Sequence, residues 1–221
     1  MMKPSLPAYF SRIGFLGHAR PDEATLINLH RLHAETIPFE NLDVLLGRPI
    51  QLSTEALFDK LVASGRGGYC LEQNGLFAWV LQAIGFEIAP LTARVMLGEP
   101  EALTARTHSL LAVKIRHETW LADVGLGGKT LREPVRLAPH QAQETAGGVY
   151  RIEPHSAGDY TMEIQRANGA FAPLYRFDLR PSEPADFDMA NFYLSHWEGS
   201  PFRRRLLVSR QLSTGGKLTL K

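Results

Sequence analysis

Residues 66–86 read RGGYCLEQNGLFAWVLQAIGF and join a glycine-rich turn to a run with helical periodicity. From Cys70 onward, apolar residues recur at the spacing of one helix face, and Gly85 is a typical residue at a helix end. The apolar face consists of Leu76, Phe77, Val80, Leu81 and Ile84. We therefore expect a helix that begins at about Cys70 and ends at Gly85, with the only cysteine of the chain in its first turn.

Two further helices are expected on the N-terminal side of this turn. Residues 22–37 carry leucines at helical spacing and stop before a proline. Residues 53–65 begin at Ser53, a typical N-cap, and end at Gly65. The apolar positions of the two runs are Leu26, Leu29, Leu32, Leu57, Phe58, Leu61 and Val62. The pattern predicts an N-terminal helical bundle over residues 1–85.

After residue 85 the pattern changes from helical to strand-like. Five short segments are rich in β-branched and apolar residues and are separated by Gly, Pro, Asp or Asn. They read EIAPLTARVML (87–97), HSLLAVKI (108–115), TWLADVGLG (119–127), GVYRIEP (148–154) and DYTMEIQRA (159–167). This pattern predicts an antiparallel β-barrel or sandwich over residues 86–190, and an α+β fold for the chain.

The composition narrows the class of protein. The chain has 221 residues, with 24 Lys and Arg against 23 Asp and Glu, a formal net charge of +1. Such a balance gives no general attraction for nucleic acid or an anionic membrane, so neither partner is expected. The start lacks the apolar run of a secretory signal, and no later stretch is long enough to span a bilayer, so we expect a cytoplasmic protein.

The position of Cys70 suggests a reactive thiol. The first turn of a helix exposes unpaired N–H groups and the positive end of the helix dipole, both of which favour a thiolate over a thiol. Gly67 and Gly68 would let the backbone turn sharply and leave room for a substrate near the sulfur. The alternative is a small core residue on the same face as Phe77, and position alone leaves both interpretations open.

A nucleophilic cysteine needs a base, and the chain has eight histidines. His30 and His33 stand three residues apart on an expected helix, where solvated or capping roles are more typical than metal binding. His196 is interpreted as a ligand contact rather than the base. His108 opens an expected strand and is the candidate base.

Asp123 is unusual because it follows apolar residues at the end of the next expected strand. A buried carboxylate is costly unless it is paired, so we expect either a histidine partner or N–H groups from the glycine-rich turn that follows. If His117 and Glu118 form the hairpin turn, His108 and Asp123 lie on neighbouring strands but four residues out of step. A bulge at one of the following glycines would have to close that gap.

Five sequence blocks resemble the arylamine N-acetyltransferase family, bacterial type. They occur in one order and are PFENLDVLLGRPI (38–50), RGGYCLEQN (66–74), THSLLAV (107–113), LADVGLGG (121–128) and PLYRFDL (173–179). The resemblance implies a papain-like triad of Cys70, His108 and Asp123, in a helical bundle followed by a β-barrel. It implies no metal.

The same resemblance implies an activity. Members transfer acetyl from acetyl-CoA, as cosubstrate, to the nitrogen of arylamines or arylhydrazines and the oxygen of N-arylhydroxylamines, by a ping-pong route through an acetylated cysteine. The expected partners are therefore coenzyme A and a small arylamine or hydrazine. Three alternatives remain: an amide synthase of the same family, a hydrolase or transglutaminase-like enzyme with the same triad, and a ligand-binding form with little turnover.

The matched blocks also imply supporting residues and pocket residues. Residues expected to hold the turn around the nucleophile, with ordinary surface roles as the alternative, are Arg66, Glu72, Asn74, Glu40 and Asn41. Residues expected in the substrate or CoA pocket, with core packing as the alternative, are Val124, Gly125, Leu126, Gly127, Phe192, Tyr193 and Phe202. Leu126 replaces an aromatic residue that is common in the family, so we expect an altered arylamine preference.

The last part of the chain departs from the resemblance. Members continue into a third α/β domain, of which residues 191–221 would be only the start, with one hairpin around Gly215 and Gly216. We therefore expect the CoA cleft of this chain to be more open than in longer relatives.

Overall fold

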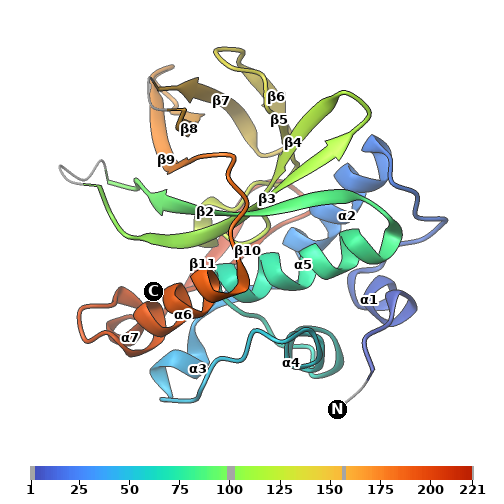
Figure 1. Cartoon of the computed structure of the whole chain (residues 1–221), viewed down its shortest axis with the longest axis vertical. Coiled ribbons are helices and arrows are strands. Elements are labelled where there is room, and N and C mark those ends of the chain that lie inside the picture. Colours follow the sequence, from blue (N-terminus) through green and yellow to red (C-terminus); the bar gives the residue numbers. More distant parts are fainter. Residues whose placement is uncertain (1–2, 99–102, 156–157, 221) are drawn as a thin grey trace.

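The computed structural model describes residues 3–98, 103–155 and 158–220 and has a helical layer beneath a curved sheet (Figure 1). Helix α5 (Cys70–Ile84) runs along this sheet, and α6 (Pro184–His196) lies beside it. The remaining helical elements are α1 (Leu6–Ile13), α2 (Glu23–Thr36), α3 (Leu42–Leu45), α4 (Thr54–Phe58), the π-helical turn η1 (Asp59–Ala63), the 3₁₀ turn η2 (Gly127–Lys129) and α7 (Pro201–Arg204).

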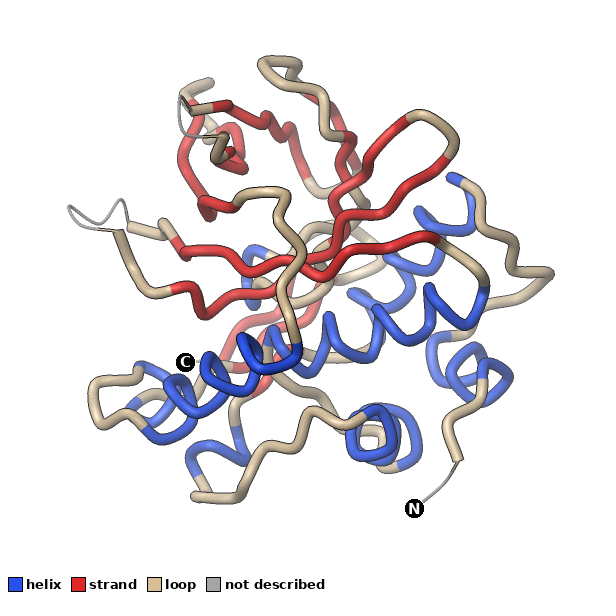
Figure 2. Tube along the Cα trace, viewed as in Figure 1, coloured by secondary structure: helices blue, strands red, loops and turns tan. Residues whose placement is uncertain are grey.

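The main sheet has eight antiparallel strands in the order β5-β4-β3-β2-β9-β8-β7-β6 and curls into a nearly closed barrel (Figure 2). Its strands are β2 (Glu87–Val95), β3 (Arg106–Ile115), β4 (Glu118–Ala122), β5 (Val135–Arg136), β6 (Gln143–Thr145), β7 (Gly148–Pro154), β8 (Tyr160–Gln165) and β9 (Phe171–Phe177). The expected α+β fold, a helical bundle followed by an antiparallel barrel, is confirmed.

A small second sheet joins the C-terminal hairpin to residues 39–40. It has the order β1-β10-β11, with β1 (Phe39–Glu40), β10 (Val208–Gln211) and β11 (Lys217–Leu220). The hairpin between β10 and β11 turns at Gly215 and Gly216, which both have positive φ, as the sequence predicts. The C-terminal hairpin therefore lies against the segment that precedes the turn before Cys70.

Local capping interactions determine where α5 begins and ends. Tyr69 is extended, and its N–H donates to Glu72 Oε2 at 3.0 Å, which closes the N-terminal turn. Gly85 ends the helix in the left-handed region at φ 105°. The predicted start and end of this helix are confirmed, as is the cap of α4 by Ser53, whose hydroxyl accepts from Ala56 N.

The hairpin between β3 and β4 differs from the expectation. Arg116 has φ 56° and lies in the turn, whereas Glu118 is already the first residue of β4. The predicted His117–Glu118 turn is therefore wrong by one residue, and Leu111 pairs with Ala122. The expected offset of four residues between His108 and Asp123 shrinks to two, because this register places Asp123, which follows Ala122, beside Leu110 rather than Ala112.

Two hydrophobic clusters share strand β3. Leu111, on one face of the strand, packs with Phe77 of α5 and other helical residues, whereas Leu110, on the other face, packs inside the barrel with Leu121. The helical cluster therefore extends across the predicted boundary at residue 85. The division into residues 1–85, 86–190 and 191–221 stays a prediction.

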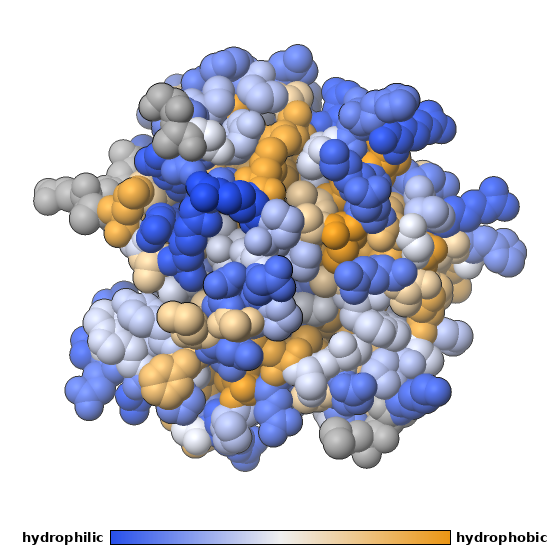
Figure 3. Space-filling model, viewed as in Figure 1, coloured by the Kyte–Doolittle hydropathy of each residue, from blue (hydrophilic) through white to orange (hydrophobic). Residues whose placement is uncertain are grey.

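The surface is mixed in polarity, with apolar patches between polar side chains on the face shown in Figure 3. Across the described ranges, none of the helices has the length and apolar character needed to traverse a lipid bilayer.

Candidate active site

Cys70 is buried at the first residue of α5, where strand β3 and the loop after β4 meet the helix. Its thiol lies 3.6 Å from the carbonyl oxygen of Thr107, and its own carbonyl accepts from Ser109 Oγ at 3.0 Å. Gly125 approaches so closely that an added Cβ would lie 2.8 Å from Cys70 Cα. The backbone of Cys70 is therefore held on two sides.

His108 and Asp123 form a buried pair beside this thiol. His108 Nε2 donates to Asp123 Oδ2 at 2.7 Å. The other carboxylate oxygen, Oδ1, accepts from Asn74 Nδ2 at 3.0 Å and from Gly125 N at 2.9 Å. Both contacts that the sequence suggested for Asp123, a histidine and the glycine-rich turn, are present at once.

In this pair, each charged group shifts the pKa of the other toward the charged form. Burial disfavours the imidazolium, but the charge and hydrogen bond of Asp123, together with the interaction with Cys70, raise the pKa of His108 to about 10. Burial likewise opposes ionisation of Asp123, but the charge and hydrogen bond of His108 outweigh it and lower the carboxyl pKa. Because Nε2 faces Asp123, Nδ1 is the ring nitrogen left for the thiol. The sulfur therefore faces a positively charged ring.

A network of buried and half-buried charges holds the turn before Cys70. Arg66 bonds to Glu40 at 2.9 Å and to Asp43 at 2.8 Å, and Lys60 joins Asp43 at 2.8 Å to Glu72 at 2.7 Å. Burial raises the pKa of Glu72 to about 7 against the opposing charge of Lys60. Asp43 lies within a matched sequence block, whereas no sequence signal marks Lys60.

The glycines of this turn have a different role from the one expected. A Cβ on Gly68 would lie 2.7 Å from Glu72 Oε2, and a Cβ on Gly67 would lie 2.9 Å from the Glu40 side chain. The Glu72 carboxylate fills the space beside Gly68. The Pro38 carbonyl oxygen and the Glu40 side chain fill the space beside Gly67, so neither space is left for a substrate.

The other two supporting residues anchor distant segments. Asn74 accepts from Val124 N at 3.0 Å and donates to the carbonyl of Ser109 at 2.7 Å. Asn41 donates to the carbonyls of Phe202 and Arg205 at 2.7 and 2.8 Å. These amides join α5 to the barrel and α7 to the segment after β1.

His30 and His33 are fully buried, so their expected solvated or capping roles are wrong. His33 accepts from Tyr9 OH at 2.8 Å and donates to Gln73 Oε1 at 2.7 Å. His30 Nε2 accepts from Asp123 N at 3.1 Å. Burial lowers the pKa of His30 to about 4 and that of His33 to about 3, so both rings are neutral. Their burial against residues far along the chain left no mark in the local pattern.

A cavity of about 770 Å³ opens onto Cys70 and His108. It brings together four of the expected pocket residues, Gly125, Leu126, Gly127 and Phe202. Further lining residues that the sequence did not indicate include Phe39, Val95, Leu97, Lys129, Leu207 and Lys217. The wall is largely apolar, with two lysines among its lining residues.

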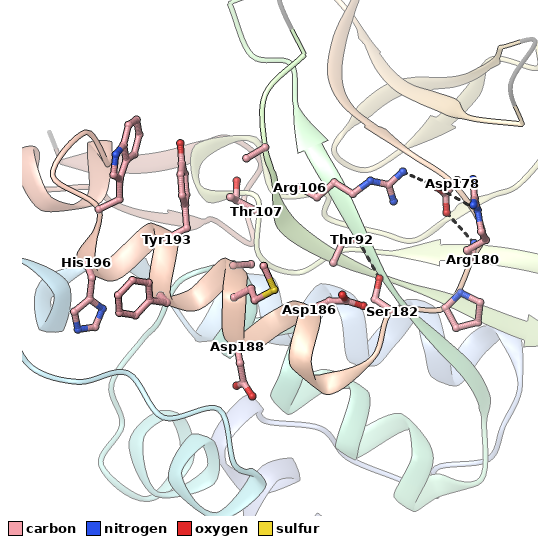
Figure 4. Close-up of a pocket in the computed structure, with 16 residues that line it drawn as sticks. Thr92, Arg106, Thr107, Asp178, Arg180, Ser182, Asp186, Asp188, Tyr193 and His196 are labelled. Carbon is pink, nitrogen blue, oxygen red and sulfur yellow. Dashed lines mark hydrogen bonds and ion pairs between the residues drawn. The ribbon is translucent and has the colours of Figure 1, made fainter.

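The remaining expected pocket residues lie elsewhere. Phe192 and Tyr193 line a larger cavity of about 1030 Å³ that does not include Cys70, with Tyr193 and His196 on one side and Arg106 and its partners on the other (Figure 4). Val124 is buried in the helical cluster. The smaller cavity is the one that holds the thiol and its histidine. Among the described residues, no group of His, Cys, Asp and Glu is arranged to hold a metal ion.

Comparisons with known proteins agree with this geometry. A family model described as N-acetyltransferase matches residues 22–221. The arylamine N-acetyltransferase of Escherichia coli is 47% identical, over 99% of this chain and 77% of its own length. A Salmonella typhimurium relative, named arylamine N-acetyltransferase / N-hydroxyarylamine O-acetyltransferase, is 46% identical over 99% of this chain and 77% of its own length.

Solved structures show the same fold. The arylamine N-acetyltransferase from Salmonella typhimurium superposes with a TM-score of 0.95 at 44% identity, covering 100% of this chain and 80% of that one. The Mycobacterium marinum enzyme in complex with CoA gives 0.90 at 31% identity, covering 98% and 87%. The chain therefore belongs to the arylamine N-acetyltransferase family and is an acetyltransferase enzyme.

Proposed function

We propose that this chain transfers acetyl from acetyl-CoA to the nitrogen of arylamines or arylhydrazines, and to the oxygen of N-arylhydroxylamines, through an acetyl-Cys70 intermediate. The observation that carries the proposal is the continuous arrangement of Cys70, His108 and Asp123, with a 2.7 Å bond inside the buried pair. The names of the relatives and the CoA complex of one of them support the substrates.

In the first step, the Cys70 sulfur attacks the thioester carbonyl. The C–S bond to coenzyme A breaks when the tetrahedral intermediate collapses, and the departing thiolate takes a proton from His108. The Cys70 and Leu71 N–H groups lie in the first turn of α5, where a helix has no carbonyl partners for them, and are our candidates to stabilise the oxyanion.

In the second step, the amine nitrogen attacks acetyl-Cys70. The bond from the carbonyl carbon to Cys70 Sγ breaks, and His108 takes the proton that the nitrogen loses. Asp123 orients the ring through Nε2 and stabilises its charge in both steps. No third protein group has to gain or lose a proton.

The lining of the cavity suits both proposed substrates. Phe39, Leu126 and Phe202 supply apolar surface for an aromatic ring, and Lys129 and Lys217 add positive charge that favours the phosphates of CoA. Coenzyme A and a small aromatic amine are therefore the proposed partners.

Initial-rate kinetics test the route. Double-reciprocal plots against acetyl-CoA at several concentrations of aniline should be parallel, and release of CoA should match formation of acetanilide. Intersecting lines would argue against the two-step route. Release of CoA at an unchanged rate without aniline would favour the thioester hydrolase.

A further inference from the structure

The His30 side chain contacts the backbone of Asp123, a member of the proposed triad. The ring lies on α2, is fully buried, and packs edge-on against Phe77 with ring centroids 5.8 Å apart. Its Nε2 accepts from Asp123 N at 3.1 Å. The mechanism described above gives this ring no chemical step.

This contact fixes the protonation of the ring. Because Nε2 accepts, the single proton of the neutral imidazole is on Nδ1. Nδ1 has no partner within hydrogen-bond distance in the described structure and lies near the backbone of Arg132. Burial lowers the pKa of His30 to about 4 even though the charge of Asp123 acts to raise it. The ring thus remains an acceptor throughout the neutral range.

Asp123 needs such an acceptor because of its place in the strand. The β4 ladder ends at Ala122, so the next N–H has no sheet partner. The carboxylate is already shared among His108, Asn74 and Gly125. The bond to His30 therefore holds the N–H of Asp123 itself, while the next N–H, that of Val124, donates to Asn74 Oδ1.

We propose that His30 is a positioning residue of the acetyl-transfer site, whose neutral ring fixes Asp123 so that its carboxylate reaches His108. This inference rests on the proposed function, since it assumes that Cys70 and His108 act as a pair. The titratable groups that face His30 are Asp123 and His33. Those that face His108 are Asp123, Cys70 and Tyr175.

The test is the pH profile of Cys70 alkylation by iodoacetamide. His30→Leu removes the acceptor, loosens Asp123 and weakens the imidazolium, so the profile should move up by about one pH unit, a roughly tenfold slower reaction near neutral pH. His30→Gln places an amide oxygen near the same point and should restore the wild-type profile. Leu29→Val, a change on the same helix within the buried helical cluster, should lower stability but not move the profile.

The outcomes separate the inference from the function on which it rests. A wild-type profile in His30→Leu would overturn the role of His30 while leaving the triad intact. An ordinary thiol profile in the wild type itself would instead contradict the proposed function. If His30→Leu does not fold, His30→Asn, whose shorter amide stops short of Asp123 N, is expected to show the same upward shift, and an unshifted profile there counts against the inference.

Discussion

Gly125 lies in close contact with the backbone of Cys70. A Cβ at this position would lie 2.8 Å from Cys70 Cα and 2.9 Å from Asn74 Nδ2, distances that side chains do not tolerate without movement. The backbone N–H of the same residue donates to Asp123 Oδ1. One glycine thus sets both the approach of the β4 loop to α5 and the orientation of the carboxylate.

We expect Gly125→Ala to lower the free energy of unfolding by about 1–3 kcal/mol, because the added methyl group forces a packed contact apart. Acetyl transfer should fall as well, since the movement displaces Cys70 or Asp123. Gly128→Ala is the matched control: its Cβ would have no neighbour closer than 3.7 Å. Urea unfolding and steady-state rates of the two variants should differ; equal stability would contradict the close approach.

The raised pKa of His108 predicts how stability depends on pH. Its folded value of about 10 lies above the ordinary value of 6.5, so its contribution is fully present below pH 6.5 and is lost as pH rises through about 10. The free energy of unfolding should therefore fall across this window, by an amount on the order of a few kcal/mol.

Asp123→Asn removes the charge that raises the pKa and should flatten this dependence. Urea unfolding at several pH values gives the comparison. If the two proteins lose stability in parallel over the window, the His108–Asp123 pair is not the cause of the loss.

At the scale of elements, the charged network joins α3, η1 and α5. Lys60 lies in the π-helical turn and holds Asp43 of α3 and Glu72 of α5 at 2.8 and 2.7 Å. Glu72 also accepts from the N–H of Tyr69, the residue directly before Cys70. Lys60 therefore acts on the start of α5 through Glu72.

We expect Lys60→Met to lower the free energy of unfolding by about 3–5 kcal/mol above neutral pH, because it leaves the buried Glu72 carboxylate without its cation, whereas Asp43 keeps Arg66. The loss should shrink toward pH 5, roughly, because Glu72, whose pKa is already about 7 beside Lys60, is protonated there and needs no partner. Lys60→Arg, which keeps the charge, serves as control. A loss that does not vary with pH would mean that Lys60 acts by packing alone.

In these elements, the features that depend on local sequence could be predicted, and those that depend on packing between distant elements could not. The limits of α5 were predictable because capping and the glycine stop are local. The hairpin turn was misplaced because Arg116 adopts a positive φ that nothing in a non-glycine residue announces. The burial of His30, the role of Lys60 and the separation of Tyr193 from the Cys70 cavity all depend on how distant elements pack, which periodicity does not encode.

At the scale of the molecule, the helical layer and the barrel share one core. Phe77 of α5 packs in the same cluster as Leu111 and Trp120 of the sheet, and β10 pairs with β1. The proposed triad is divided between these parts, with Cys70 on the helix and His108 on the sheet. The site therefore depends on the two parts folding together.

This shared core predicts one cooperative unfolding transition. Variants that retain only Trp79, on α5, or only Trp120, on β4, should show the same urea midpoint by fluorescence, and that midpoint should match circular dichroism. Separate midpoints would show that the helical bundle and the barrel are independent domains.

The most direct measurement of the central claim is the intact mass of the protein after mixing with acetyl-CoA. We expect a gain of one acetyl group, located after digestion on the peptide that contains Cys70, its loss when aniline is added, and no gain in Cys70→Ala. His108→Gln should acquire the group slower by a factor of about 10²–10⁴. Transfer to aniline at an undiminished rate by purified Cys70→Ala, or an adduct on another residue that aniline discharges, would contradict it.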